Sequence, residues 1–139
     1  MAIVQGTCVA GKVAFASGVI VPSTDTLKIA LYTSAASLDG YTAAYTVDSE
    51  ITGVGYTAGG ATLVNATVGS SGLTVWLTFD NALWASATIT ARGALIYDSS
   101  KSDVAIAVLD FGADKSVTDA TFTVTFPVAT ATTALIRFN

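Results

Sequence analysis

The chain has 139 residues, of which 52% are hydrophobic and 12% are charged, with a formal net charge of −4 and no histidine. This length favours a single domain. The scattered basic residues argue against nucleic acid as a partner, because phosphate contacts require clustered Lys and Arg. Without histidine, the chain cannot form a His-based catalytic triad or a zinc site with imidazole ligands.

The chain has a single cysteine, Cys8, which excludes an internal disulfide. We expect this residue to behave as a small apolar side chain rather than as a reactive thiol. The sequence shows no secretory signal and no apolar run of the length that crosses a membrane. We therefore expect a soluble protein, with no membrane partner, made in a reducing cytoplasm.

The first half of the chain contains one clear strand. Residues 9–21 fit either a short helix or a strand, because two glycines weaken both interpretations. Alternating apolar residues predict a strand over residues 27–32. Residues 34–60 are too long for a plain connection, so we expect a functional or partner-contacting loop there. Residues 61–68 alternate again in the manner of a strand.

The second half of the chain is dominated by residues 84–98, which are small or apolar on both faces of a long predicted strand. Such a strand needs cover on both faces, either from the rest of the domain or from another protein. Residues 104–111 are almost continuously apolar and predict a central strand that ends in a turn at Gly112. Further strands are expected at residues 73–79, 121–126 and 135–138.

About eight short strands separated by turn residues at regular spacing predict the fold class. We expect an all-β protein, an antiparallel β-sandwich of jelly-roll type. No internal repeat or linker divides the chain, so residues 1–139 are expected to form one domain.

Two short strings match enzyme motifs but lack the surroundings that those motifs need. The string Gly53-Val-Gly-Tyr-Thr-Ala58 fits a dinucleotide fingerprint, yet the residues after it alternate like a strand and not like a helix. The string Asp110-Phe-Gly112 fits a kinase magnesium triplet without any other kinase motif. We interpret the first string as glycines with a positive φ at a turn or bulge and the second as a strand end that turns at Gly112, and we expect no cofactor.

Carboxylates could support chemistry without histidine. Asp48 and Glu50 are close in sequence, but the ligand spacing of a calcium loop is absent, so we expect solvated side chains and no metal ion. Asp80 and Asp98 are expected to cap strand ends. A hydrolase with paired carboxylates remains an alternative that requires two acids facing each other across a cleft.

Aromatic residues are the other candidates for a binding site. Tyr41, Tyr45 and Tyr56 lie in the long loop, and Trp84 begins the long strand. Exposed rings stack on sugars or anchor protein interfaces, whereas Tyr56 and Trp84 could equally fill the core. Arg92 interrupts the apolar strand and needs a partner, for which an aspartate of the same chain is favoured over a ligand.

Four strings, taken together, resemble a known family. They are Asp25-Thr-Leu-Lys-Ile-Ala-Leu-Tyr-Thr33, Gly53-Val-Gly-Tyr-Thr-Ala-Gly-Gly-Ala-Thr-Leu63, Trp84 with Ala87-Thr-Ile-Thr-Ala-Arg-Gly-Ala-Leu-Ile-Tyr97, and Leu109-Asp-Phe-Gly112. Their order and spacing are similar to those of small virion structural proteins of tailed bacteriophages. The resemblance covers roughly residues 24–138 and is strongest to capsid decoration, or cement, proteins.

The resemblance implies a non-enzymatic protein, without catalytic residues, that sits on the virion exterior after synthesis in the host cytoplasm. Its implied partners are the major capsid protein and further copies of itself, as a dimer or trimer. Residues 1–11 lie outside the matching part and are a candidate arm that reaches a neighbour. The candidate interface residues are Met1, Ile3, Val4, Tyr41, Tyr45, Tyr56, Trp84 and Arg92. The alternative is a tail or fibre domain that binds host carbohydrate through its tyrosines or Trp84.

Overall fold

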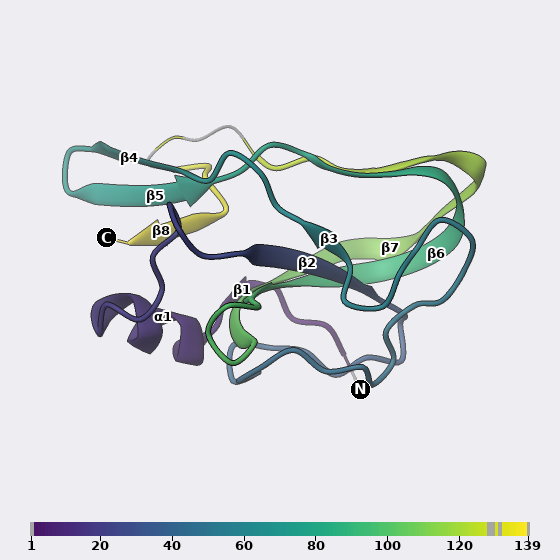
Figure 1. The fold of residues 1–139 in the computed structure, drawn as a ribbon, viewed down its shortest axis with the longest axis horizontal. Coiled ribbons are helices and arrows are strands. Elements are labelled where there is room, and N and C mark those ends of the chain that lie inside the picture. The colour runs from purple at the N-terminus through teal and green to yellow at the C-terminus, as the bar shows by residue number, and fades with distance from the viewer. Residues whose placement is uncertain (1, 128–129, 131, 139) are drawn as a thin grey trace.

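Residues 2–127, 130 and 132–138 are described by the computed structural model shown in Figure 1. One helix, α1 (Val9–Ala16), accompanies the strands. The strands are β1 (Gly6–Thr7), β2 (Leu27–Tyr32), β3 (Ala61–Thr62), β4 (Thr67–Ser71), β5 (Thr74–Thr78), β6 (Ala82–Asp98), β7 (Val104–Val124) and β8 (Ile136–Phe138). They form two antiparallel sheets, which confirms the predicted all-β sandwich.

The five-stranded sheet has the order β1-β7-β6-β2-β3, and the three-stranded sheet has the order β4-β5-β8. This arrangement does not confirm the jelly-roll topology. The strands expected at residues 27–32, 73–79, 84–98 and 135–138 are present within two residues of their predicted ends. Residues 61–68 do not form one strand, since β3 ends at Thr62 and β4 begins at Thr67.

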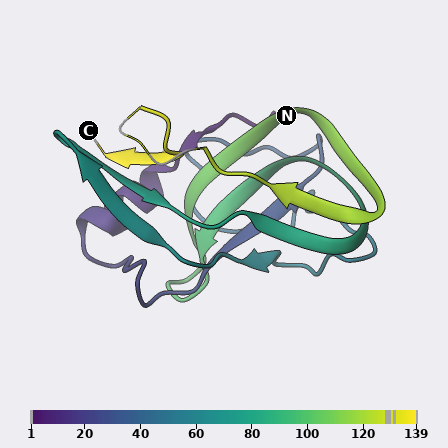
Figure 2. The same ribbon diagram turned by 90° about the horizontal axis from the view of Figure 1, so that it is seen from above.

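The long strands β6 and β7 form an antiparallel ribbon that takes part in both layers. Figure 1 shows the ribbon running along one layer, bending at one end of the molecule and returning beside β2. Figure 2 shows the same bend from above. The turn predicted at Gly112 is wrong, because the chain continues as β7 to Val124. Gly112 has a positive φ of 79°, a conformation that occurs in bulges as well as in turns.

The register of the ribbon shifts at four places, of which the largest lies at Arg92. Ala91 pairs with Lys115 and Gly93 pairs with Asp110, so Arg92 alone faces residues 111–114 of β7. Extra residues on one strand of an antiparallel pair bend that strand and increase its twist. Three further register shifts lie along the same ribbon, and together these irregularities let two continuous strands pass from one layer of the sandwich to the other.

Two hydrophobic clusters lie on opposite faces of the five-stranded sheet. The larger cluster fills the space between the layers and includes Ile96 of β6. The smaller cluster includes Leu95 and Tyr97, which point to the other face, together with Ile3 and Leu38 from the covering segments. The predicted need for cover on both faces of the strand is thus met within this chain.

The segment before β2 packs on its own domain. β1 pairs with β7, Leu38 donates its backbone N–H to Ala2 at 3.0 Å, and Ile3 is buried. Residues 9–21 form α1 and the connection that follows it, which decides between the two predicted alternatives in favour of the helix. Residues 2–8 therefore lie along the sheet and do not extend from it as an arm.

Candidate protein interface

An apolar groove of about 440 Å³ lies between α1 and the three-stranded sheet. Its lining residues come from α1, from the connection after it, and from all three strands of that sheet; they are Lys12, Phe15, Ala16, Pro22, Val68, Val75, Trp76, Leu77 and Phe138. Lys12 is the only charged side chain among the described lining residues. Such a groove suits an apolar partner surface better than a polar small molecule.

The hairpin of β4 and β5 supplies one wall of the groove. Ser71 pairs with Thr74 at the hairpin end, where Gly72 takes a φ of 58°. Trp76 lies directly over Gly69, because a Cβ atom at position 69 would come within 2.7 Å of the indole ring. Glycine at this position therefore lets a large ring lie flat on the neighbouring strand and form the floor beside the groove.

Helix α1 and β8 supply the opposite wall. Phe15 of α1 meets Phe138 of β8 edge to face, with ring centroids 5.3 Å apart. The helix buries Gly11 and Ala14 on its inner side, so the longer side chains of Lys12 and Phe15 are left to border the groove. The helix thus both anchors the wall and leaves its outer face to solvent.

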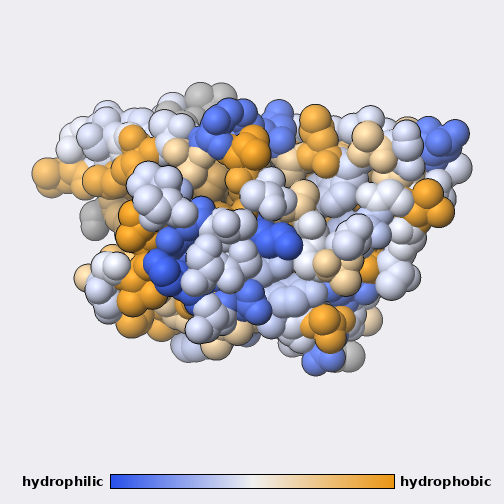
Figure 3. All heavy atoms as spheres, viewed as in Figure 1, coloured by the Kyte–Doolittle hydropathy of each residue, from blue (hydrophilic) through white to orange (hydrophobic). Residues whose placement is uncertain are grey.

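Exposed apolar side chains lie on the hairpin and on the helix that form the two walls of the groove. Leu73 at the hairpin end is 95% exposed, and Val68 and Val75 are also exposed on the same hairpin. Val9 and Val13, one helical turn apart on α1, are exposed as well. Figure 3 shows hydrophobic residues gathered at the end of the molecule formed by the hairpin and α1. Residues 66–79 contain no charge, which is the composition expected of a surface that loses water on docking.

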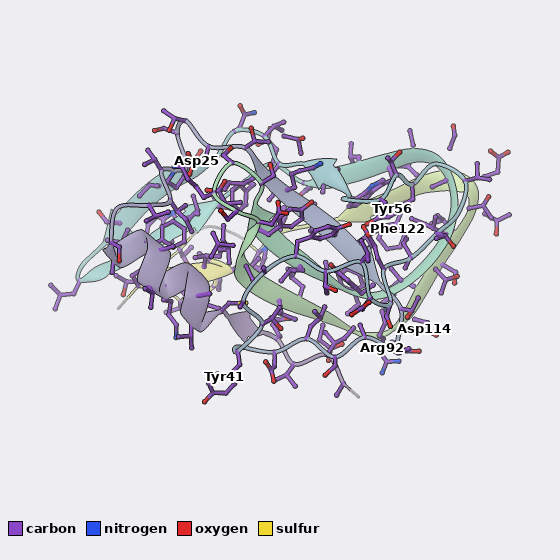
Figure 4. All side chains as sticks on the ribbon, turned by 60° about the horizontal axis from the view of Figure 1, so that its bottom comes forward. Asp25, Tyr41, Tyr56, Arg92, Asp114 and Phe122 are labelled. Carbon is purple, nitrogen blue, oxygen red and sulfur yellow. The ribbon has the colours of Figure 1, made fainter. Side chains whose placement is uncertain are left out.

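The interface residues predicted from the sequence are scattered, and none of those described lines this groove. Met1 lies outside the described residues. Ile3 is buried and Val4 is exposed beside it. Tyr41 is 86% exposed and points away from the body of the molecule in Figure 4.

Trp84 belongs to the core, with 6% of its surface exposed. Its ring lies 6.0 Å from that of Phe122, edge to face, and 6.1 Å from that of Tyr56. Figure 4 shows Tyr56 and Phe122 close together inside the fold. Of the two alternatives for Trp84, the core position is the one observed, so this ring is not available to stack on a sugar.

Glu50 organises the long loop and is not the solvated side chain expected from sequence. The Tyr45 and Tyr56 hydroxyls each donate to its carboxylate at 2.6 Å, and the Gly59 backbone N–H donates at 2.8 Å. The Tyr56 hydroxyl also accepts from the backbone N–H of Leu31 in β2 at 2.9 Å. Burial and the contact with Glu50 raise the pKa values of both phenols, so Tyr45 and Tyr56 act as fixed donors.

Arg92 pairs with aspartates of its own chain, as predicted. Its Nη1 lies 3.5 Å from Asp114 Oδ1 and its Nε lies 4.0 Å from Asp110 Oδ1. Figure 4 shows Arg92 and Asp114 side by side at the bend. All three side chains are more than a third exposed, so the pairs span the bulge at the surface, where ion pairs contribute little.

Two further sequence interpretations are confirmed. Cys8 is buried, and burial raises the pKa of its thiol to about 11, so it is an unreactive apolar residue. Asp98 caps the end of β6 by accepting the Ser100 N–H at 2.9 Å. Asp80 instead accepts from the side chain of Asn65 at 2.5 Å.

Sequence reasoning missed the groove itself. The alternation of Leu73, Val75, Leu77 and Phe79 predicts one buried face for β5, but only Leu77 and Phe79 are buried. The missed signal is the absence of charge over residues 66–79 combined with Val9 and Val13 at helical spacing.

Comparisons with protein-family profiles, curated proteins and solved structures gave no match. None of the described helices is long and apolar enough to cross a membrane. Within the described part of the chain, no three His, Cys, Asp or Glu side chains gather closely enough to hold a metal ion. The apolar groove therefore stands as the candidate site on its own geometry.

Proposed function

We propose that this chain is a non-enzymatic phage virion protein that binds the outer surface of a capsid shell and stabilises it. The proposal begins from the resemblance of its four strings to capsid decoration proteins. The structural observation that supports it is the apolar groove with its rim of exposed valines and Leu73. The partners are the major capsid protein at this groove and, on the particle, further copies of the same chain.

The groove gives the proposal a physical basis. Burying one Val or Leu side chain contributes about 1.5–3 kcal/mol, so covering the exposed leucine and valines of the hairpin and α1 would favour a contact. Part of that gain offsets the cost of association, and only the remainder appears as affinity. Many copies that each add a modest contact would together resist internal pressure from packaged DNA.

Low charge around the groove suits a repeated, closely packed lattice. Neighbouring copies carry no charged residue on the hairpin, so they do not repel one another at that end. The rigid sandwich behind the groove holds its walls in place, which lowers the entropy that docking would otherwise cost.

The test uses purified shells, with and without the protein, and counts bound copies by cryo-electron microscopy and gel densitometry. We expect hundreds of copies per particle and a higher temperature for shell disruption. A handful of copies per particle, or no binding to shells, contradicts the proposal.

A pair of leucine variants tests whether the groove end makes the contact. Leu73→Ser removes the most exposed apolar side chain at the hairpin end, whereas Leu83→Ser makes the same change at an exposed position on β6 outside the groove. We expect Leu73→Ser to weaken shell binding about tenfold or more, as loss of one well-packed apolar anchor does. Leu83→Ser should bind as the parent does, and equal affinities for both variants would place the contact elsewhere.

The carbohydrate alternative has weaker support. Trp84 is buried, and Tyr45 and Tyr56 use their hydroxyls on Glu50, which leaves Tyr41 as the one freely exposed ring of the four. A sugar site ordinarily needs an aromatic ring with polar groups that converge beside it. Binding to a glycan array that is lost on Tyr41→Ala would revive this alternative.

A further inference from the structure

Two carboxylates lie against each other at the end of β6. The Asp98 side chain is 0% exposed, and its Oδ2 has no hydrogen-bond donor among the described residues. The Asp25 side chain, from the connection between α1 and β2, is 5% exposed, and it lies beside Asp98 because Leu27 of β2 pairs with Asp98 in the sheet. A hydrogen bond between two carboxyl groups requires a proton on one of them, because ionised carboxylates only accept.

Lys101 favours the ionised form of Asp25 over that of Asp98. Its Nζ lies 3.0 Å from Asp25 Oδ1 and donates to the Val19 backbone carbonyl at 2.7 Å. The Val21 backbone N–H donates to Asp25 Oδ2 at 2.9 Å. Asp25 therefore has the cation and the donors that favour a carboxylate, whereas Asp98 is fully buried with one oxygen that lacks a donor, which favours the neutral acid.

The pair joins two segments that are distant in sequence. Beside it, the Thr26 backbone N–H donates to Ser100 Oγ at 2.7 Å, and the Ser99 N–H donates to the Thr26 carbonyl at 3.0 Å. The connection that carries Asp25 also carries Pro22, which lines the apolar groove. The turn after β6 thus fixes the segment that forms part of the groove wall.

We propose that Asp25, Asp98 and Lys101 form a clasp that holds the connection between α1 and β2 against the sheet while one proton is shared, and loosens it when that proton leaves. Loss of the proton places two carboxylates in contact away from water, which a single lysine does not fully compensate. Among the described residues, Asp25 and Lys101 are the charged groups that act on Asp98. The inference holds whatever partner the groove binds.

The direction of the pH effect follows from the two pKa values. Burial and the contact with Asp25 raise the pKa of Asp98 to about 6, and the hydrogen bond with Asp98 leads the contacts that lower the pKa of Asp25 to about 2. A raised pKa contributes stability below the unfolded value of 3.8, and this contribution is lost as the pH rises through about 6. The lowered pKa of Asp25 contributes above 3.8 and is lost as the pH falls through about 2. The clasp therefore contributes most to stability near pH 4, and its contribution falls as the pH rises from about 4 to about 6.

Asp98→Asn tests the clasp, because the amide donates to Asp25 as the shared proton does but does not titrate. Urea unfolding of both proteins at pH 4.5 and 7.5 gives the ratio of their unfolding constants at each pH. We expect the ratio, parent over variant, to rise roughly tenfold or more across this range. Asp110→Asn, which removes an exposed carboxylate, is the control and should leave the ratio nearly constant. A ratio that is constant for Asp98→Asn overturns the proposal.

Hydrogen exchange of the parent protein gives a second test that needs no variant. After correction for the intrinsic pH dependence, the Thr26 and Ser99 amides should lose protection above pH 7, while the Leu95 amide inside β6 keeps it. Unchanged protection of Thr26 and Ser99 between pH 5 and 8 would show that the segment stays closed without the proton. Shell binding is not measured in either test, so failure here is distinct from failure of the proposed function.

Discussion

The two halves of the continuous strand β6 have different surroundings. From Ala82 to Ala91, buried and exposed positions nearly alternate, because only one face of the strand meets the core. From Gly93 to Asp98 every residue is buried, because the second face is covered too. The exposed face of the first half carries serine and threonines, whereas the covered face of the second half carries Leu95 and Tyr97, so composition and cover change together along the strand.

The cover of the second face comes from segments with little regular structure. Ile3 and Leu38 pack on this face, and the long loop is fastened to the sheet through Glu50 and its tyrosines. Tyr45 stacks on Tyr97 of β6 with ring centroids 4.7 Å apart. The loop at residues 34–60 therefore has a structural task as a lid on the sheet.

The largest expected effect on the free energy of unfolding comes from a comparison of one leucine in each half of β6. Leu95→Ala removes a fully buried side chain from the doubly covered half, and we expect it to lower the free energy of unfolding by about 2–5 kcal/mol. Leu83→Ala removes an exposed leucine from the other half and should change it by less than about 0.5 kcal/mol. Urea unfolding measures both. Similar costs would mean that the two halves are equally covered.

An intermediate effect on the free energy of unfolding is expected where Glu50 holds the long loop over the second face of β6. Glu50→Gln replaces one acceptor oxygen with a donor that faces a tyrosine hydroxyl or the Gly59 N–H, and it should cost about 1–3 kcal/mol of unfolding free energy. Asp48→Asn changes an exposed carboxylate in the same loop and serves as the control. If the two variants unfold at the same urea concentration, Glu50 does not fasten the loop.

The smallest effect on the free energy of unfolding is expected at Arg92, which lies between the two halves of β6. Arg92→Gln removes two exposed ion pairs across the bulge and should cost less than about 1 kcal/mol. The loss should shrink further in 1 M salt, which screens exposed charges. A cost of several kcal/mol that persists in salt would show that the ion pairs, and not the bulge, determine the bend.

The strands themselves could be predicted because periodicity is a local property. Residues 27–32 and 84–98 carry their pattern in neighbouring side chains, and both form strands. Gly112 could not be interpreted correctly, since a positive φ occurs in turns and bulges alike. The choice between them depends on whether β6 continues beside β7, and residues near Gly112 do not contain that information.

The sites were less predictable than the strands. Asp25 and Asp98 meet only because β2 pairs with β6, so their contact depends on the tertiary register. Glu50 could not be distinguished from Asp48 by sequence, because its partners come from tyrosines whose orientation the sheet decides. Arg92 was predictable, since a charged residue in an apolar strand requires a counter-charge wherever the strand lies.

The pairing of β1 with β7 has a consequence for how the chain is made. Gly6 and Thr7 find their partners in Val108 and Ala107, near the other end of the chain. During synthesis, β1 must therefore wait until β7 has left the ribosome, while the hairpin of β4 and β5 can close early. Distant pairings of this kind slow folding and expose unpaired edges meanwhile. Refolding of the complete chain should accordingly be limited by the pairing of distant strands such as β1 and β7.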